Sequence, residues 1–138
     1  MFEFKSMRNS ELMRDYRHVL KTALSCLGFC SQEVAIKKML AECRPRYDVT
    51  FDYALRMMQL MLRDGKSCPA KGLKVEMWKE IACHVNETME RRHCSLHKAV
   101  ALVLAEKRAS RYFLSYKQAA KIIHYEQQKG RHSRPCRA

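Results

Sequence analysis

Two short segments of the sequence combine positively charged side chains with a tyrosine. Their members are Arg44, Arg46 and Tyr47 in the first segment, and Lys107, Arg108, Arg111 and Tyr112 in the second. Cations on a connection between helices can reach phosphate groups, and an exposed tyrosine can stack on an unpaired base. In the structural alternative, the cations face the negative C-terminal ends of the preceding helices, and the tyrosines fill the core.

Three further cations complete the predicted nucleic-acid site. Arg56 and Lys121 lie on the helices expected after the two segments, and Arg131 opens a basic C-terminal tail. A DNA-binding helix-turn-helix joins its helices by about three or four residues. Here seven residues separate Glu42 from Thr50, which disfavours that motif. A looser arrangement in which a helix reads a groove remains an alternative.

Cysteine and histidine side chains are concentrated in one stretch of the chain. They are Cys83, His84, His93, Cys94 and His97. Zinc is the metal that such ligands bind. No Cys-x-x-Cys pair accompanies them, and His84 and His93 should lie on different faces of one helix, which is poor geometry for a tetrahedral site. We therefore expect no metal and no other cofactor.

The sequence patterns that are typical of enzymes are missing from this chain. It has no glycine-rich phosphate loop, no nucleophile elbow and no carboxylate pair whose spacing demands a shared function. A cysteine and a histidine could meet in the fold, but seven cysteines and six histidines make such a meeting expected by chance. The prediction is a protein that is not an enzyme and has no evident small-molecule substrate.

The overall charge favours a polyanionic partner. The 138 residues include 27 Lys and Arg against 14 Asp and Glu, a formal net charge of +13. Such an excess favours nucleic acid first and an anionic membrane second, with a basic protein that binds neither as the alternative. The first seven residues mix acidic and basic side chains, and no apolar run approaches membrane-spanning length. We expect a cytoplasmic protein with reduced cysteines and no membrane partner.

Composition and capping signals predict an all-α fold. The chain contains only four glycines and three prolines, which is typical of helices joined by short connections. Apolar spacing predicts about six helices, near 11–27, 32–42, 51–64, 75–92, 96–107 and 116–130. The expected N-caps are Ser10, Ser31, Thr50, Ser95 and Ser115. Residues 65–74 form the predicted linker, and 131–138 the predicted frayed tail.

The second half of the chain resembles the first. Offsets of 64, 65 and 62 residues align the second helix with the fifth, the third with the sixth and the first with the fourth. Matching pairs are Ala35 with Ala99, Tyr47 with Tyr112, Thr50 with Ser115 and Tyr16 with Trp78. Any two amphipathic helices share alanine, leucine and glutamate, so the helix matches alone can arise by chance. The ordered match of the two non-helical segments is not explained in this way. We therefore expect two pseudo-symmetric three-helix repeats, about 10–65 and 75–130, in one compact domain.

The repeated segments also resemble a known group of proteins. Residues 45–50 and 110–115, each followed by a basic helix that contains alanine, are similar to a small family of short, basic, uncharacterised bacterial proteins with two helical repeats. The resemblance covers about Ser10 to Gly130. It implies a multihelical fold with two similar halves, and it transfers no activity, cofactor or functional residue.

Two functional hypotheses follow from the sequence. The first is a non-enzymatic nucleic-acid-associated protein, with DNA as the expected nucleic acid. Its predicted binding residues are Arg44, Arg46, Arg56, Lys107, Arg108, Arg111, Lys121 and Arg131. The second is a protein-interaction or self-assembling module, because apolar residues from Met57 to Leu62 cover more than half of the third predicted helix.

Overall fold

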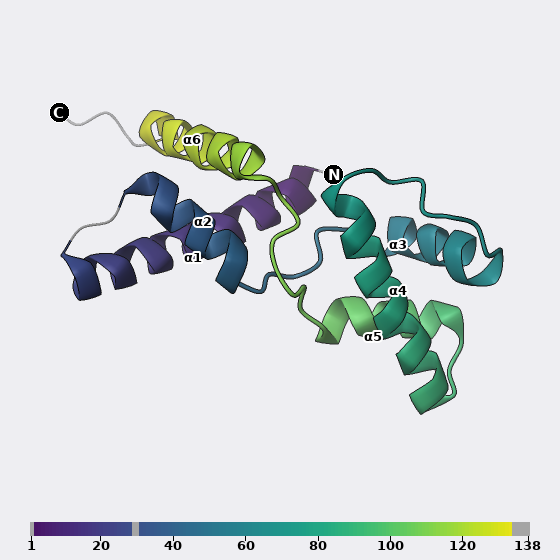
Figure 1. Ribbon diagram of the computed structural model, residues 1–138. Helices are drawn as coiled ribbons and strands as arrows, with labels where there is room; N and C mark the ends of the chain where they lie inside the picture. The colour runs from purple at the N-terminus through teal and green to yellow at the C-terminus, as the bar shows by residue number, and fades with distance from the viewer. Residues whose placement is uncertain (1, 29–30, 134–138) are drawn as a thin grey trace. The chain divides into compact units, whose positions relative to one another are not determined.

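The computed structural model describes residues 2–28 and 31–133, and this part of the chain is helical with no strand (Figure 1). Its α-helices are α1 (Phe2–Leu27), α2 (Gln32–Glu42), α3 (Phe51–Met58), α4 (Leu73–Arg92), α5 (Leu96–Glu106) and α6 (Tyr116–Ser133). A π-helical turn, η1 (Gln59–Arg63), continues α3. The predicted all-α fold class is confirmed. None of the described helices combines the length and apolarity that a membrane span requires.

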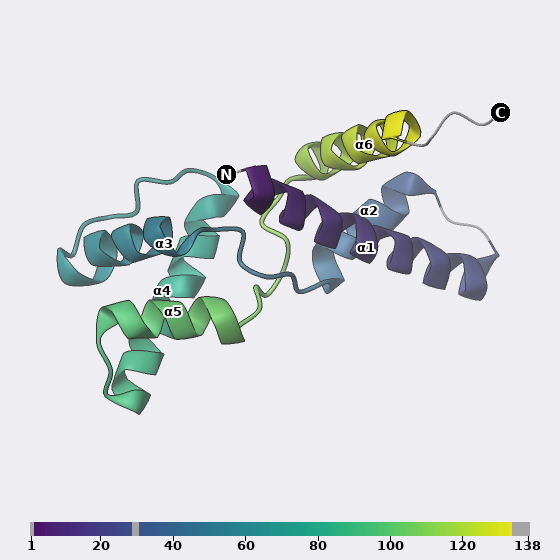
Figure 2. The ribbon, with the colours of Figure 1, turned by 180° about the vertical axis from the view of Figure 1, so that it is seen from behind.

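The helices form two compact units whose members do not follow chain order. The first unit contains α1, α2 and α6, and in it α6 packs against both other helices (Figure 2). The second unit, residues 44–113, contains α3, η1, α4 and α5, and α5 packs against both α3 and α4. This grouping differs from the expected repeats, because the third helix of each repeat packs with the first two helices of the other.

Each unit has its own apolar core. In the first unit, the buried side chains are Leu12, Met13, Tyr16, Val19, Ala23, Ala35, Ile36, Met39, Leu114, Ala119 and Ile123. In the second unit, Tyr112 is buried, and a core cluster is formed by Tyr47, Ala54, Met57, Met58, Met77, Trp78, Ile81, Ala82, Val85, Ala99, Val100, Val103 and Ala109. Most of these residues recur at helical spacing, so one face of each helix supplies the core.

α2 and α5 begin and end in the same way. The Ser31 hydroxyl accepts a hydrogen bond from the Val34 N–H, and the Ser95 hydroxyl accepts one from the Lys98 N–H, both at 3.2 Å. Each helix has 11 residues and is followed by a C-cap residue in extended conformation. The predicted starts of both helices are therefore confirmed, and both helices direct the following chain into an extended segment.

α1 begins earlier than the capping signal predicts. A serine at position 10 followed by Glu11 is typical of a helix start, yet Ser10 lies inside a helix that runs from Phe2. No glycine or proline interrupts residues 2–27, so nothing local stops the helix from extending upstream. Its C-terminal end is as predicted, because Gly28 has φ 83° and donates its N–H to the Leu24 carbonyl at 2.9 Å.

The C-terminal helix is longer than predicted. α6 continues to Ser133, beyond the expected end near Gly130, so the first three residues of the predicted frayed tail are helical. The rest of that tail, 134–138, lies outside the described residues. The sequence also predicts Phe29 as a hydrophobic closure after Gly28, and this residue lies outside the described part of the chain as well.

The apolar residues that suggested an interaction module pack within the second unit. Met57 and Met58 are buried, and Met61 and Leu62 pack against the core of this unit. The π-helical bond from the Asp64 N–H to the Gln59 carbonyl, at 3.0 Å, widens this turn of the helix. Burial inside one chain therefore accounts for most of the apolar excess on this helix.

Candidate nucleic-acid interface

Two extended segments lie side by side in the second unit. We call residues 44–49 the first link and residues 107–113 the second link. The backbone N–H of Ala109 donates a hydrogen bond to the Pro45 carbonyl at 2.8 Å, which joins the two links (Figure 1). Segments that are more than 60 residues apart in the sequence are thus neighbours in space.

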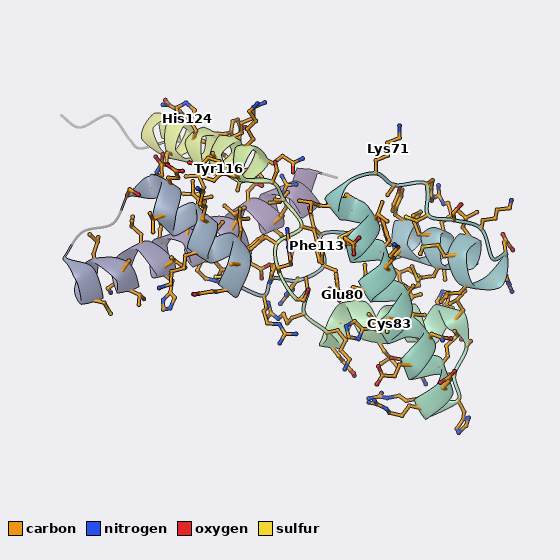
Figure 3. All side chains as sticks on the ribbon, in the orientation of Figure 1. Lys71, Glu80, Cys83, Phe113, Tyr116 and His124 are labelled. Carbon is orange, nitrogen blue, oxygen red and sulfur yellow. The ribbon has the colours of Figure 1, made fainter. Side chains whose placement is uncertain are left out.

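A single carboxylate on α4 holds both links. Glu80 Oε1 accepts hydrogen bonds from the Tyr47 hydroxyl at 2.7 Å and from the Ser110 N–H at 2.8 Å. Glu80 Oε2 accepts a third bond from the Ser110 hydroxyl at 2.6 Å. Glu80, labelled in Figure 3, is a half-buried residue of α4 and precedes buried Ile81. Bonds to an ionised acceptor are stronger than neutral ones, so this side chain fixes the links relative to α4.

We call Glu80 and its two partners, Tyr47 and Ser110, the clamp. Their contacts shift the pKa values of Glu80 and Tyr47. Burial alone would raise the pKa of Glu80, but hydrogen bonds from Ser110 and Tyr47 outweigh this effect, and its pKa lies below the usual value. The pKa of Tyr47 is raised, because burial and the bond to Glu80 both favour the neutral phenol. The arrangement observed here therefore requires an ionised Glu80 and a protonated Tyr47.

Acid should remove the stability that the clamp supplies. Because folding lowers the pKa of Glu80 below its ordinary value of 4.5, its contribution is complete above that pH and is lost as the pH falls through the folded pKa. We expect the difference in unfolding free energy between the wild type and Glu80→Gln to shrink from neutral pH to about pH 3. Urea denaturation at several pH values measures this difference. A difference that is independent of pH would contradict the role given to the charge.

Alternation along the extended backbone explains why the cations of the first link face outward. Successive side chains of an extended chain point in opposite directions. In the first link, Arg44 and Arg46 are exposed, whereas Pro45 and Tyr47 are buried. In the second link, Arg108 is exposed beside buried Ala109. The chain then bends at Ser110 and Arg111, which are both exposed, before buried Tyr112. The apolar neighbours anchor each link on the core, and the cations consequently extend into solvent.

The structure brings five of the eight predicted binding residues onto these links. We call this set the link cations: Arg44, Arg46, Lys107, Arg108 and Arg111. Lys107 is half-buried as the C-cap of α5, and the other four are exposed. Arg56 is exposed on α3 of the same unit, and Lys121 is exposed on α6 of the first unit. The side chain of Arg131 lies outside the described residues.

Arg111 is oriented by its own neighbours. Its Nε donates to the Tyr112 carbonyl at 3.3 Å, and its guanidinium carbon lies 5.7 Å from the centre of the Phe113 ring. A guanidinium at this distance from an aromatic ring is held by a cation–π interaction while its edge stays accessible. The contacts of Arg111 are thus with its own link, not with the C-terminal carbonyls of α5 that the structural alternative proposed for it.

The two tyrosines of the links are buried, and Tyr47 belongs to the core of the second unit. Tyr47 is 6% exposed and Tyr112 is 3% exposed, so neither presents a ring to solvent. The suggestion that these rings stack on unpaired bases is therefore wrong, and the structural alternative is correct for them. Each is large enough to anchor an extended segment by burial, and Tyr47 also reaches Glu80 through its hydroxyl.

Two acidic residues in or next to the links form ion pairs with cations on α4. Asp48 lies 3.7 Å from Lys74 at the start of α4. Glu106 lies 3.5 Å from Arg92 at the end of α4. These half-exposed ion pairs contribute little to stability, but they direct two carboxylates towards α4.

Sequence reasoning missed Glu80 and Ser110 as members of the site. Glu80 lies in a helix with regularly spaced apolar residues, where a glutamate looks like an ordinary solvated side chain. Ser110 is 30 residues away, and neither position carries a capping or motif signal that would connect them. The contact between Glu80 and Ser110 arises from the tertiary packing of α4 against the second link.

The cysteine and histidine residues of α4 and α5 do not come together as a metal site. Among the described residues, no three His, Cys, Asp or Glu side chains are grouped so that they could hold an ion. Cys83 is exposed, Cys94 Sγ lies 4.0 Å from the Thr88 carbonyl, and the His97 ring contacts Phe51 edge-on at 4.9 Å. These side chains act as helix-end, packing and surface residues.

The chain was compared with protein families, curated proteins and solved structures. No family model matches the chain, and neither the curated proteins nor the solved structures compared with it give a match. The function must therefore be argued from the site itself.

Proposed function

We propose that this protein binds nucleic acid without catalysing a reaction, and that the two clamped links provide its main phosphate contacts. The observation that carries the proposal is the gathering of the five link cations on two adjacent extended segments, held together by Glu80 and by the bond from Ala109 to Pro45. Cations on a fixed backbone lose less conformational freedom on binding than cations on a flexible tail.

DNA is the nucleic acid that this surface suits best. Recognition of single strands uses exposed aromatic rings on which bases stack, and the link tyrosines are buried. Without such a platform, the links can contact only the phosphate backbone, which duplex DNA presents at high charge density. A cytoplasmic location, where DNA is accessible in bacteria and thiols stay reduced, belongs to this proposal.

The duplication read from the sequence also belongs to the proposal. Two features support it: the matching caps of α2 and α5, and the matching starts of α3 and α6, where Thr50 and Ser115 accept hydrogen bonds from Tyr53 and Gln118. In this view, each copy contributes its third helix to the unit of the other copy. The two links are then equivalent segments, and one ancestral cationic link has become two that lie together.

Salt dependence tests this function on the wild-type protein. Five phosphate contacts predict a slope of about −4.5 for the logarithm of the association constant against the logarithm of salt concentration. Affinity for a fluorescent duplex of DNA should therefore fall by about two to three orders of magnitude between about 50 and 200 mM salt. Fluorescence anisotropy measures this change. No detectable binding at the lower concentration would exclude the function, as would affinity that salt leaves unchanged.

A further inference from the structure

α6 carries a second basic surface that the links do not explain. On this 18-residue helix, Lys117, Lys121, His124 and Tyr125 follow one another at spacings of four, three and one residues, which places them on one side. We call these four residues the outer face of α6. All four are exposed, and Tyr125 reaches 61% exposure, high for so large a side chain. His124 points away from α1 and α2 in Figure 3.

The opposite side of α6 is bound to the rest of the first unit. Ala119 and Ile123 are fully buried where α6 packs against α1 and α2. Tyr116 also faces α2, since the Lys37 ammonium lies 5.9 Å from the centre of its ring. Glu126, the acidic residue of this helix, is half-buried on a different side from the cations. The outer face therefore combines positive charge, an imidazole and a phenol without a carboxylate of its own helix.

The start of α6 is held firmly. The Ser115 hydroxyl accepts a hydrogen bond from the Gln118 N–H at 3.2 Å, and the Gln118 side chain accepts one from the Ser115 N–H at 2.9 Å. This reciprocal pair is a capping box, which satisfies two backbone donors that a helix start leaves without an intrahelical partner. A helix of 18 residues is about 27 Å long, and the major groove of B-form DNA, about 12 Å wide, admits such a helix.

The corresponding surface of α3 has a different charge pattern. At the offset of 65 residues, Lys117 corresponds to Asp52, and Lys121 corresponds to Arg56. A carboxylate beside a cation repels phosphate as strongly as the cation attracts it. α3 also has only eight residues before the π-helical turn. Of these two helices, α6 alone has the charge and the length of a DNA-reading element.

We propose that the outer face of α6 enters the major groove of duplex DNA, where Lys117 and Lys121 contact phosphates or guanine edges and His124 and Tyr125 face the bases. This inference rests on the proposed function, since it assigns a second contact to the same ligand. Duplex RNA does not fit, because the major groove of the A-form is too deep and narrow to admit a helix. The inference therefore commits to B-form DNA.

The test compares two double variants of the full chain that lose the same charge. Lys117→Gln with Lys121→Gln removes cations from the outer face, whereas Lys21→Gln with Lys38→Gln removes exposed cations from α1 and α2 of the same unit. The first variant should bind a DNA duplex of about 20 base pairs at least 10-fold more weakly, because a phosphate that the protein no longer neutralises keeps its counterions. The second should change affinity less than about 3-fold. Circular dichroism confirms that both variants keep their helices.

Protection of guanine N7 from methylation reports directly on the major groove. Wild-type protein should protect N7 positions of the duplex, and the outer-face variant should lose this protection while the control retains it. Equal losses of affinity in the two variants would overturn the inference, as would unprotected N7 positions in a bound wild-type complex. Binding with unprotected N7 leaves the role of the links intact, so the two proposals can fail separately. Absence of any binding by the wild type would overturn both.

Discussion

Replacing Glu80 by alanine should lower the unfolding free energy of the second unit by about 2–4 kcal/mol. The substitution removes an ionised acceptor that receives three hydrogen bonds and leaves the hydroxyl of a buried tyrosine without its acceptor. Hydrogen bonds to charged groups are worth about 1.5–3 kcal/mol each, and partial exposure of Glu80 reduces their sum. Urea denaturation followed by the fluorescence of Trp78, a core residue of this unit, measures the change.

Two comparisons separate the clamp from a general effect of removing a glutamate. Glu90→Ala changes an exposed carboxylate on the same helix and should alter stability by less than about 0.5 kcal/mol. Tyr47→Phe removes one of the three bonds and keeps the buried ring, so we expect a loss of about 1 kcal/mol. Equal effects of Glu80→Ala and Glu90→Ala would show that Glu80 does not hold the links.

Replacing the five link cations by glutamine should weaken binding to duplex DNA by at least about 100-fold at low salt. Non-specific affinity for DNA comes almost wholly from the release of counterions, and every phosphate that a link cation neutralises adds to this release. The substituted side chains lie outside the core, and glutamine keeps most of their length, so the fold should persist. Fluorescence anisotropy with a labelled duplex measures the decrease in affinity.

A matched control distinguishes the position of the charges from their number. The control uses five of the exposed cations that the second unit carries away from the links: Arg63, Lys66, Lys71, Lys79 and Lys98. Their joint replacement by glutamine gives the same change of net charge. We expect less than about 10-fold weaker binding, since long-range attraction alone is reduced. Decreases of equal size would mean that net charge, and not the clamped links, governs binding.

Local chemistry made most helix boundaries predictable. Ser31, Thr50, Ser95 and Ser115 each cap the helix that the sequence predicted for them. A cap is made within four residues, so its signal is complete in the local sequence. Ser10 shows the limit of this reasoning, because a capping residue inside a stretch of good helix formers does not end the helix.

For α2, the sequence predicted the helix more securely than it predicted which of its faces is buried. Apolar spacing in the sequence predicts a stripe of Val34, Ala35, Met39 and Leu40 on α2. In the structure, Val34 is 54% exposed, whereas Ile36 is 1% exposed. Ala35, Ile36 and Met39 share one side of the helix, and Val34 lies about 140° away from Met39. Both assignments are compatible with the spacing in a helix of 11 residues. Packing against α1 and α6 decides between them.

The candidate site could be predicted only in part. Repetition in the sequence singled out both links and the matching cations Arg46 and Arg111, and the other three link cations stood out by their charge near a tyrosine. Similarity does not say which segments touch, so the packing of α6 with α1 and α2 and the bond from Ala109 to Pro45 were not predictable. Glu80 was missed for the same reason, since its partners are 30 and 33 residues away.

The slope of binding against salt, measured for the link variant and for its matched control, tests the central claim most directly. Phosphate contacts by the five link cations predict a slope of about −4.5 or steeper for the wild type and a slope shallower by about 4.5 for the link variant. The control, with the same net charge, should keep nearly the wild-type slope. Equal slopes for the two variants would show that the clamped links make no direct contact with phosphate.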